Sequence, residues 1–561
     1  MPLRQQLDRG GSDRGDLALA VHRYAKALGR DPGGFAKELA AGLVLTPGVA
    51  GISAAGAFLN IMADPVWLTR NLLGSVFARR ERWGHLDGPP TATCVEHTSA
   101  NPTGPFHVGR VRNGIIGDTL ARVLRATGAS VTTQYYVDDV GRQAAMIAWI
   151  WSKPRAEWPP EILAALGGAT PEEEERMRPD ARYGRPYSAV SRWLKSDPVA
   201  AAEVQAISRR LEAGEEVPRH RELAKQVLDG MVGSLARIDI GFDEFVWESK
   251  FLRDGSVERV VERLRSAPHA VREENGAWAL DTAGYGLPKE SARVIVTRAD
   301  GTTLYAVRDV AYHLEKFARF ARAIDVLGQD HHLHAKTLDA MLAELGETRR
   351  PEFVIYQDIT VPEGGRMSTR QGKVVYLDDL LDEAVERARA EVVRRRDDLT
   401  PPEVDAIARA VAAAAVRYHI VRVTPEKTVQ FQWEDALAFE GKSGPFLQYS
   451  FARASSILRK AELAGDPGYE AGSLQGVDEQ RLVKVLSRFP GVVGAVARTT
   501  HVHALAGYAY QVAEEFNHFY ETTTVLGAGP ERSSRLALVL ATQRTLGNAL
   551  ALLGLEPLER M

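Results

Sequence analysis

Cysteine is almost absent from this chain. Cys94 is the one cysteine among 561 residues, so neither a disulfide framework nor a cysteine-based zinc site can form within the chain. Such usage is typical of a reducing compartment, and we expect a cytoplasmic protein. The charged N-terminus, MPLRQQLDRGGSDRGD, lacks the apolar segment of a signal peptide.

Long apolar runs and a strong net charge are missing too. The absence of an uninterrupted run of about 18 apolar residues predicts no membrane-spanning helix and no membrane partner. The formal net charge is −3, so an RNA-binding surface has to be a local patch. At 561 residues the chain is long enough for several domains.

The most informative stretch is residues 96–118, EHTSANPTGPFHVGRVRNGIIGD. A β-rich segment ends here, and a Pro/Gly-rich turn with Asn101 and His107 follows it. Apolar residues then recur at helical spacing after Gly109, and a second strand is predicted over 131–137. Free N–H groups at such a helix start favour a phosphate. The fingerprint GxGxxG is absent from this turn, so no dinucleotide cofactor is implied.

Residues 1–88 predict a small α/β accessory domain. Two helices are expected over 17–28 and 32–43, and residues 49–61 are strand-like. A domain with only a solvated surface and an RNA-docking module are both compatible with this pattern.

Residues 89–395 predict a multidomain α/β core, in which an insertion over about 150–290 divides a nucleotide-binding sheet. Further strands are expected over 292–297, 323–327 and 353–359. Residues 400–561 predict an all-α helical bundle, which begins at a capping box with proline at the first helical position.

Two acids, Asp138 and Asp139, end the second strand of the core. Acids at a strand end lie where open α/β sheets bind ligands. The alternative is that Asp139 caps the following helix.

A glycine-rich basic loop over 364–373 is the second unusual stretch. Arg366, Arg370 and Lys373 alternate with small residues there, which suits a mobile clamp on a polyphosphate. A solvated surface loop is the simpler interpretation of this loop alone. A His-x-Gly turn follows the first strand, and Met-Ser-Thr-Arg follows the last, with a long insertion between them. The two motifs together identify a type of protein far more specifically than either motif does alone.

These two signatures resemble those of class I aminoacyl-tRNA synthetases, and in particular arginyl-tRNA synthetases. The match covers essentially the whole chain. It includes the Asn101–His107 turn, the central segment Tyr305–Asp309, the Arg366–Arg370 signature, and softer helical segments around Tyr449 and Asn517. The resemblance implies a Rossmann-like class I catalytic core with an N-terminal accessory domain and a C-terminal anticodon-binding bundle.

The resemblance also implies an activity. An arginine–tRNA ligase activates L-arginine with ATP and Mg²⁺ and transfers it to the 3′ end of tRNA(Arg). No protein nucleophile or resident metal site is required, since catalysis is alignment and charge stabilisation. The implied partners are tRNA(Arg), L-arginine and ATP, and we expect a monomer. The alternative is a non-catalytic or repurposed RNA-binding paralogue.

Site residues follow from the resemblance, position by position. The implied catalytic residues are His107, Gly109, Arg110, Arg366, Ser368, Arg370 and Lys373. The implied arginine-binding residues are Glu96, Ser99, Asn101, Tyr305, Asp309 and Gln329. The implied ATP-binding residues are His107, Gly109, Gly328, Asp330, His331 and Met367. The implied tRNA-binding residues are Gln448, Tyr449, Arg453, Asn517, Tyr520 and Met561.

Some positions depart from the family signatures. Arg110 replaces the second histidine of the first signature, and Arg366 and Thr369 replace lysines of the second. Arginine is always charged and binds phosphate in a bidentate way, so these changes are compatible with phosphate binding. For Asp309, a salt bridge to a neighbour such as Arg308 is the alternative to a role in binding a guanidinium.

Overall fold

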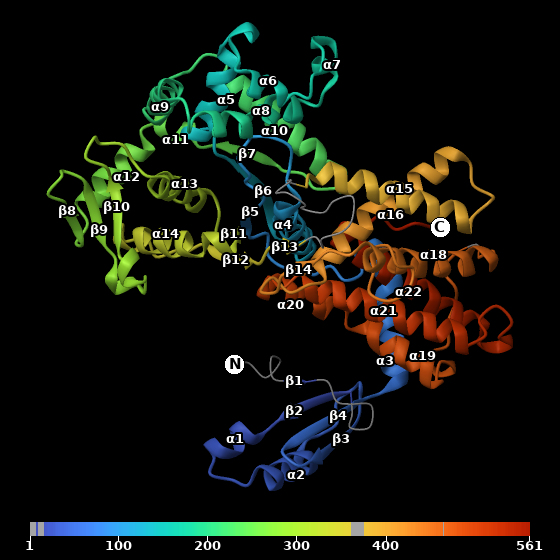
Figure 1. Cartoon of the computed structure of the whole chain (residues 1–561). Coiled ribbons are helices and arrows are strands. Elements are labelled where there is room, and N and C mark those ends of the chain that lie inside the picture. The colour runs from blue at the N-terminus through green and yellow to red at the C-terminus, as the bar shows by residue number, and fades with distance from the viewer. Residues whose placement is uncertain (1–6, 9–15, 361–374, 464) are drawn as a thin grey trace.

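The computed structural model describes residues 7–8, 16–360, 375–463 and 465–561. Its centre is a five-stranded parallel sheet in the order β12-β11-β5-β6-β7 (Figure 1). The strands are β5 (Ala92–Glu96), β6 (Ser130–Val137), β7 (Glu244–Trp247), β11 (Arg322–Gly328) and β12 (Glu352–Tyr356). This parallel core confirms the predicted class I fold.

Helices cover both faces of the sheet. Ile324 and Val326 of β11 pack in one core cluster with α4 (Val108–Ala126), whereas Ala323 packs in another with α13 (Tyr305–Arg319) and α14 (His332–Glu344). Because alternate residues of a strand point to opposite faces, the two clusters lie on the two sides of the sheet. Parallel strands buried in this way are typical of doubly covered α/β sheets.

The predicted insertion is mostly helical, but its boundaries need correction. Its helices are α5 (Arg142–Ser152), α6 (Pro160–Ala164), α7 (Pro171–Arg176), α8 (Pro179–Trp193), α9 (Pro198–Glu212), α10 (His220–Ala236), α11 (Ser249–Arg253) and α12 (Ser256–Arg265). Strand β7 lies inside the predicted range yet forms the edge of the central sheet. A four-residue strand is too short to stand out from its helical surroundings by periodicity.

The strand predicted over 292–297 forms, but outside the central sheet. It is β10 (Arg293–Thr297), which pairs antiparallel with β9 (Trp278–Asp281), and β9 pairs with β8 (Ala270–Arg272). Strand pairing is set by long-range contacts that a single segment does not encode.

The N-terminal domain is a four-stranded antiparallel sheet in the order β1-β2-β4-β3 with two helices. Its elements are β1 (Leu7–Asp8), β2 (Leu17–Ala20), α1 (His22–Ala27), α2 (Pro32–Gly42), β3 (Val49–Ala55) and β4 (Phe58–Ala63). The helix predicted over 17–28 is therefore wrong in its first half, because pairing of β2 with β4 overrides helix propensity there.

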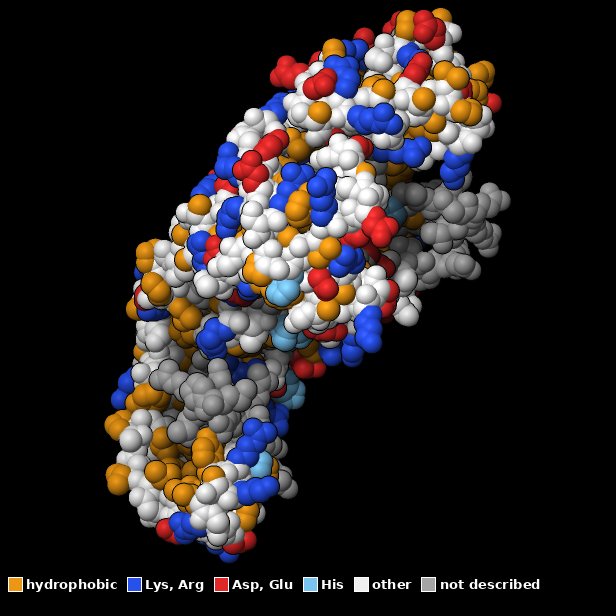
Figure 2. Space-filling model, turned by 90° about the vertical axis from the view of Figure 1, so that its left-hand side faces the viewer, with side chains coloured by type: hydrophobic (Ala, Val, Ile, Leu, Met, Phe, Trp, Pro, Cys, Tyr) orange, Lys and Arg blue, Asp and Glu red, His pale blue; other side chains and the backbone are white. Residues whose placement is uncertain are grey.

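Helix α3 (Pro65–Arg79) joins this domain to the C-terminal bundle rather than to the sheet (Figure 1). Just beyond it, buried Trp83 donates from Nε1 to Thr545 Oγ1 over 3.0 Å. The N-terminal sheet projects from this attachment, and Figure 2 shows hydrophobic side chains gathered at that lower end of the molecule. Exposed hydrophobic residues of the N-terminal domain include Leu28, Val44, Phe58 and Met62.

The C-terminal region confirms the predicted helical bundle. Its helices are α15 (Leu377–Arg395), α16 (Pro401–Val421), α17 (Trp433–Ala436), α18 (Gly444–Lys460), α19 (Val477–Ser487), α20 (Phe489–Thr499), α21 (His503–Thr522) and α22 (Arg532–Leu553). The predicted capping box at Thr400 is present at the start of α16. The segment Gly529–Leu553 is apolar and long enough to cross a membrane, but 67% of its apolar 18-residue stretch is buried, as in the core helix of a bundle.

Buried arginines connect the bundle to α4. Arg417 of α16 is fully buried and contacts Asp118 of α4 over 2.5 Å, and it also donates to the Leu553 and Ile238 carbonyls. Arg112 of α4 donates to four backbone carbonyls, those of Gln357, Val423, Thr424 and Lys427. The helix that begins at the first signature is thus tied directly to the C-terminal region.

Candidate active site

A cleft of about 410 Å³ opens at the carboxyl ends of the central strands. This edge is where open parallel sheets bind ligands, since loops diverge there. The residues that line it include Glu96, Ser99, Asn101, His107, Gly109, Arg110, Tyr136, Asp138, Glu248, Tyr305, Asp309, His313, Asp325, Gly328, Asp330, His331, His334 and Asp358. They come from segments that lie far apart in the sequence, between residues 96 and 358.

His107 is the N-cap of α4. Its Nδ1 accepts a hydrogen bond from Gly109 N over 2.9 Å, so Nδ1 carries no proton and Nε2 carries it. Burial, with a smaller effect of Arg110, lowers the pKa of His107, which favours this neutral ring. The exposed ring therefore presents an N–H donor beside the free N–H groups of the helix start, a combination suited to a phosphate oxygen.

Glycines set how closely this helix approaches the sheet. A Cβ on Gly109 would lie 2.8 Å from His107 Nδ1, and a Cβ on Gly117 would lie 2.3 Å from His97 Cβ. Both contacts are too short for a real side chain. Glycine at these positions therefore permits the histidine cap at one and close helix–strand packing at the other.

The chain that enters α15 pairs with the same turn. Val108 N donates to Val375 O over 3.0 Å, and Leu377 N donates to Phe106 O over 2.8 Å. The end of the segment that carries the second signature is thus held beside His107. The signature residues Arg366, Met367, Ser368, Arg370 and Lys373 themselves lie outside the described residues.

The turn after β5 is held by side chains from neighbouring strands. Thr98 and Ser99 both have positive φ, 73° and 37°, a conformation that is unfavourable for residues other than glycine. Ser99 Oγ donates to Glu96 Oε1 over 2.8 Å. Asn101 Nδ2 lies 3.0 Å from both Asp138 Oδ2 and Gln143 Oε1, so Asn101 is oriented at the rim of the cleft.

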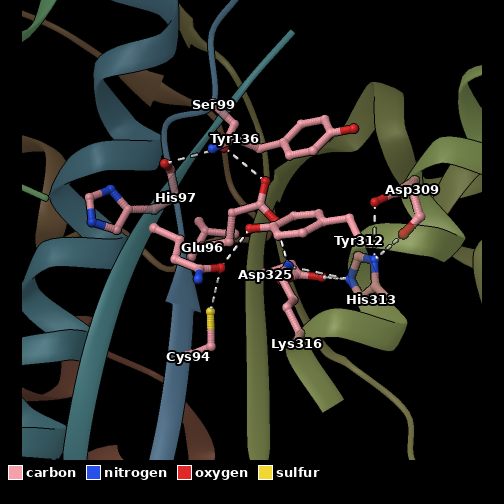
Figure 3. A network of polar contacts seen from close by, with 12 residues as sticks. Cys94, Glu96, His97, Ser99, Tyr136, Asp309, Tyr312, His313, Lys316 and Asp325 are labelled. Carbon is pink, nitrogen blue, oxygen red and sulfur yellow. Dashed lines mark hydrogen bonds and ion pairs between the residues drawn. The ribbon is translucent and has the colours of Figure 1, made fainter. Parts of the chain in front are cut away.

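A buried charge network forms the floor of the cleft (Figure 3). Lys316 Nζ lies 2.5 Å from Glu96 Oε2 and 2.6 Å from Asp325 Oδ1. Burial alone would lower the pKa of Lys316, but Asp325 and Glu96 outweigh it and the pKa is raised. Lys316 therefore stays charged and holds together two acids at paired positions of the adjacent strands β5 and β11.

His313 extends this network to Asp309. Its Nε2 lies 2.7 Å from Asp325 Oδ2, and its Nδ1 lies 3.0 Å from Asp309 Oδ1. Burial lowers the pKa of His313, but the two acids outweigh burial and raise it to about 10. The ring is an imidazolium that donates from both nitrogens, which fixes the carboxylate of Asp309 in the cleft wall.

Asp309 does not pair with Arg308. Burial raises its pKa, but His313 and His334 outweigh burial, and the pKa lies well below the ordinary value. Arg308 instead pairs with Glu248, a buried acid whose pKa burial and Asp138 raise. Asp309 therefore forms ion pairs with His313 and His334, and not with Arg308.

The cleft brings together most of the residues predicted for arginine and ATP. Gln329 is the exception, because it is exposed and is not among the lining residues. Asp139 neither caps the following helix α5, whose N-cap is Gly141, nor lines the cleft; it is buried and accepts from Ser249 N and Oγ at the start of α11. Sequence reasoning missed Glu248 and His334. Glu248 directly follows β7, so an acid at a strand end was the signal available for it.

A second hollow, of about 860 Å³, lies in the helical bundle. Tyr449, Arg453, Tyr520 and Met561 line it together with Arg396, Arg459, Lys460 and Arg560. The Arg453 guanidinium lies 4.9 Å from the Tyr449 ring centroid and 4.7 Å from that of Tyr520, and it donates to Asn517. Aromatic faces and several cations in one hollow suit unpaired nucleic-acid bases and phosphates.

Gln448 does not reach this hollow. Its side chain is fully buried in the bundle, and its Nε2 donates to Glu556 O over 2.9 Å. The prediction that it contacts tRNA is therefore wrong for this structure, because on α18 it faces the core while Tyr449, the next residue, faces outward.

Comparison with known proteins agrees with this arrangement. Residues 80–433 match the family described as tRNA synthetases class I (R), catalytic domain, and residues 447–561 match the DALR anticodon binding domain. An arginine–tRNA ligase of Methanocella arvoryzae is 42% identical over 96% of this chain and 92% of its own. One from Methanothermobacter thermautotrophicus is 41% identical over 91% of this chain and 86% of its own.

Solved structures give the same result. The Thermus thermophilus arginyl-tRNA synthetase matches with a TM-score of 0.85 and 28% identity, over 99% of this chain and 96% of that one. An arginyl-tRNA synthetase from Plasmodium falciparum, 17% identical, shares the fold with a TM-score of 0.76. These matches favour a ligase over a non-catalytic paralogue. With a class I catalytic domain, an anticodon-binding domain and relatives this similar along nearly all of its length, the chain belongs to the arginyl-tRNA synthetase family.

Proposed function

We propose that the cleft activates L-arginine with ATP and that the product is transferred to tRNA(Arg). The arginine carboxylate attacks the α-phosphate, which forms arginyl-adenylate and releases pyrophosphate. The terminal ribose of the tRNA then attacks the adenylate carbonyl and releases AMP. The observation that carries the proposal is a pair of acids, the half-buried Asp309 and the buried Glu248, in the same cleft as the turn at His107.

Asp309 and Glu248 are the proposed acceptors for the guanidinium. A planar guanidinium has five N–H donors in a rigid fork, which matches carboxylate oxygens better than a compact ammonium does. Tyr305, one helical turn before Asp309, flanks that position, and Glu96, Ser99 and Asn101 are proposed for the α-amino and carboxylate end. The pKa of Asp309 lies well below its ordinary value, so this side of the cleft carries a negative charge and favours a cationic side chain over a neutral one.

The phosphate side uses donors and positioning. The Nε2–H of His107 and the start of α4 are aimed at the α-phosphate region, and Arg110 adds a cation. Gly109 gives adenine access to bare backbone, and Gly328, Asp330 and His331 are proposed for the nucleoside. Mg²⁺ arrives with ATP, bound to its phosphates. Arg366, Met367, Ser368, Arg370 and Lys373 of the second signature are proposed to complete this side.

The bundle hollow is the proposed anticodon site. Tyr449 and Tyr520 offer faces on which bases stack, and Arg453, Arg560 and Lys460 offer charge to the backbone. Asn517 accepts a hydrogen bond from Arg453, and Met561 lines the same hollow. We also propose that the N-terminal sheet docks the tRNA, and that the protein works in the cytoplasm as a monomer.

The test is charging of total tRNA with each of the twenty amino acids in turn. Arginine alone should be attached. We also expect arginine-dependent ATP–pyrophosphate exchange that appears only, or far better, when tRNA is present. Failure to charge any tRNA with arginine across a range of salt and Mg²⁺ concentrations would refute the proposal, and RNA binding without exchange would favour the non-catalytic paralogue.

A further inference from the structure

Asp309 already has a hydrogen-bond partner on each carboxylate oxygen. Oδ1 faces His313, and Oδ2 lies 2.6 Å from Nε2 of His334. Because the pKa of Asp309 lies well below its ordinary value, the carboxylate is ionised and accepts, so His334 donates from Nε2. A guanidinium that binds Asp309 in a fork therefore meets two oxygens that each already accept from a histidine.

The two histidines are held very differently. His313 has both nitrogens on acceptors and is fixed between α13 and β11. His334 has only the bond to Asp309, since its Nδ1 is buried and has no hydrogen-bond partner among the described residues. A buried polar atom left unpaired is unfavourable, so this position of the ring is less well satisfied than that of His313.

His334 lies in the first turn of α14 and lines the cleft. Its ring centroid lies 6.3 Å from that of His331 and 4.9 Å from that of the exposed Tyr305. These two neighbours make ring contacts with His334, so among the described residues its bond to Asp309 is the hydrogen bond that holds the ring in place.

We propose that His334 is a placeholder for the substrate: in the empty cleft its Nε2–H satisfies Asp309 Oδ2, and the guanidinium of arginine displaces it. This inference rests on the proposed role of Asp309 as the guanidinium acceptor. The exchange replaces one N–H donor by another, so the carboxylate never stays buried and unpaired. A ligand without a donor leaves Asp309 with an unmet acceptor, so the exchange selects for a side chain that brings N–H groups.

The exchange has a direction that mutation can test. His334→Ala removes a bond made only by the empty enzyme, so the empty state loses stability and the arginine complex does not. We therefore expect His334→Ala to lower the KM for arginine about tenfold, which is about 1.4 kcal/mol, with the KM for ATP unchanged. The thermal midpoint of the full chain without ligands should fall, and with saturating arginine it should return to that of the wild type.

His334→Gln is the matched control. A glutamine amide reaches about as far as imidazole Nε2 and keeps an N–H for Asp309, so the arginine KM and the ligand-free midpoint should both stay near the wild-type values. A higher arginine KM in His334→Ala, restored by His334→Gln, would overturn the inference, because His334 would then support Asp309 in the complex. An unchanged KM would overturn it equally.

The variant Asp309→Asn distinguishes the placeholder role of His334 from the proposed role of Asp309 as the guanidinium acceptor. If Asp309→Asn raises the arginine KM strongly while His334→Ala does not lower it, only the placeholder role fails. If Asp309→Asn leaves the arginine KM unchanged, the guanidinium site itself is elsewhere and both statements fail. Each variant is measured by tRNA charging at saturating ATP and tRNA, with kcat and KM determined separately.

Discussion

At the scale of single residues, the cleft works through charges that are buried but paired. Lys316 and His313 lie between Glu96, Asp325 and Asp309, so three carboxylates are held by two cations within one network. An isolated buried carboxylate would bind a proton instead, because burial disfavours the charged form. The pairing keeps Asp309 ionised, which is the state that binds a cationic substrate.

Asp309→Asn is expected to raise the KM for arginine about 100-fold, which corresponds to about 2.7 kcal/mol. The neutral amide cannot accept a charge-assisted fork, while ATP and tRNA contact other residues. Charging kinetics with each substrate varied in turn measure this. Asp330→Asn is the reciprocal control, since its effect should fall on ATP. Equal losses for arginine and tRNA with Asp309→Asn would indicate a structural role.

His313 makes stability depend on pH. Its pKa is about 10 in the folded protein against an ordinary 6.5, so the protonated ring stabilises the fold. That contribution is complete below pH 6.5 and is lost as the pH rises toward 10. The thermal midpoint of His313→Gln should therefore lie further below that of the wild type at pH 6 than at about pH 10. Exposed His22→Gln is the control, and a difference independent of pH would contradict this.

At the scale of elements, the start of α4 lines the part of the cleft that is proposed to bind phosphate. Its N-cap is a histidine, which is not among the residues most favoured at that position. The same ring nitrogen that caps the helix forces the other nitrogen to be the donor. His107 thus has two roles, since one ring nitrogen caps α4 and the other is the proposed donor to phosphate. A substitution can remove one role and keep the other.

His107→Asn is expected to keep the cap and lose the donor to phosphate. Asparagine is a good N-cap residue, so the thermal midpoint should stay near that of the wild type. The loss of one aimed donor should lower kcat about 100-fold or more, as for other charge-stabilising groups. His107→Ala should lose stability in addition, by about 1 kcal/mol. A kcat unchanged in His107→Asn would exclude direct contact with the reacting phosphate.

At the scale of the whole molecule, the two hollows are linked through α4 and the bundle. Arg112 and Arg417 tie α4 to the region after α16 and to α22, and the end of the second-signature segment pairs with the turn before α4. A displacement of the bundle would therefore be transmitted to the turn before α4. If tRNA promotes activation of arginine, as proposed above, this connection is the expected structural route.

Arg453→Ala is expected to raise the KM for tRNA about tenfold, with kcat at saturating tRNA close to that of the wild type. The guanidinium lies between Tyr449 and Tyr520, so its loss removes charge and also frees both rings. Filter binding of tRNA and charging kinetics measure the change. Arg272→Ala, which removes an exposed arginine on β8, is the matched control. A similar loss in both variants would indicate a general effect of net charge.

Arg417→Met is expected to destabilise the chain by about 3–5 kcal/mol, because it leaves Asp118 buried with a weaker set of partners. The thermal midpoint should fall in the absence of any substrate. Arg417→Met combined with Asp118→Leu should recover much of the loss, since no buried charge is then left unpaired. No recovery in the double variant would show that the bonds from Arg417 to backbone carbonyls are what matters.

The sequence by itself determined the signatures, the order of the domains and most of the cleft. Residues such as His107, Asn101 and Asp309 lie in motifs that are local along the chain, and turn chemistry and helical periodicity are local too. For the same reason the strand–turn–helix unit around α4 could be predicted before any contact was known.

Only the tertiary structure decided which distant groups meet. Glu248 and His334 line the cleft, Gln448 is buried in the bundle, and residues 17–20 form a strand. Each of these outcomes depends on packing between segments that lie far apart in the chain. The partners of Asp309 are the clearest case. Its neighbour Arg308 turns to Glu248, and His334, 25 positions away, takes the oxygen that we assign to the substrate.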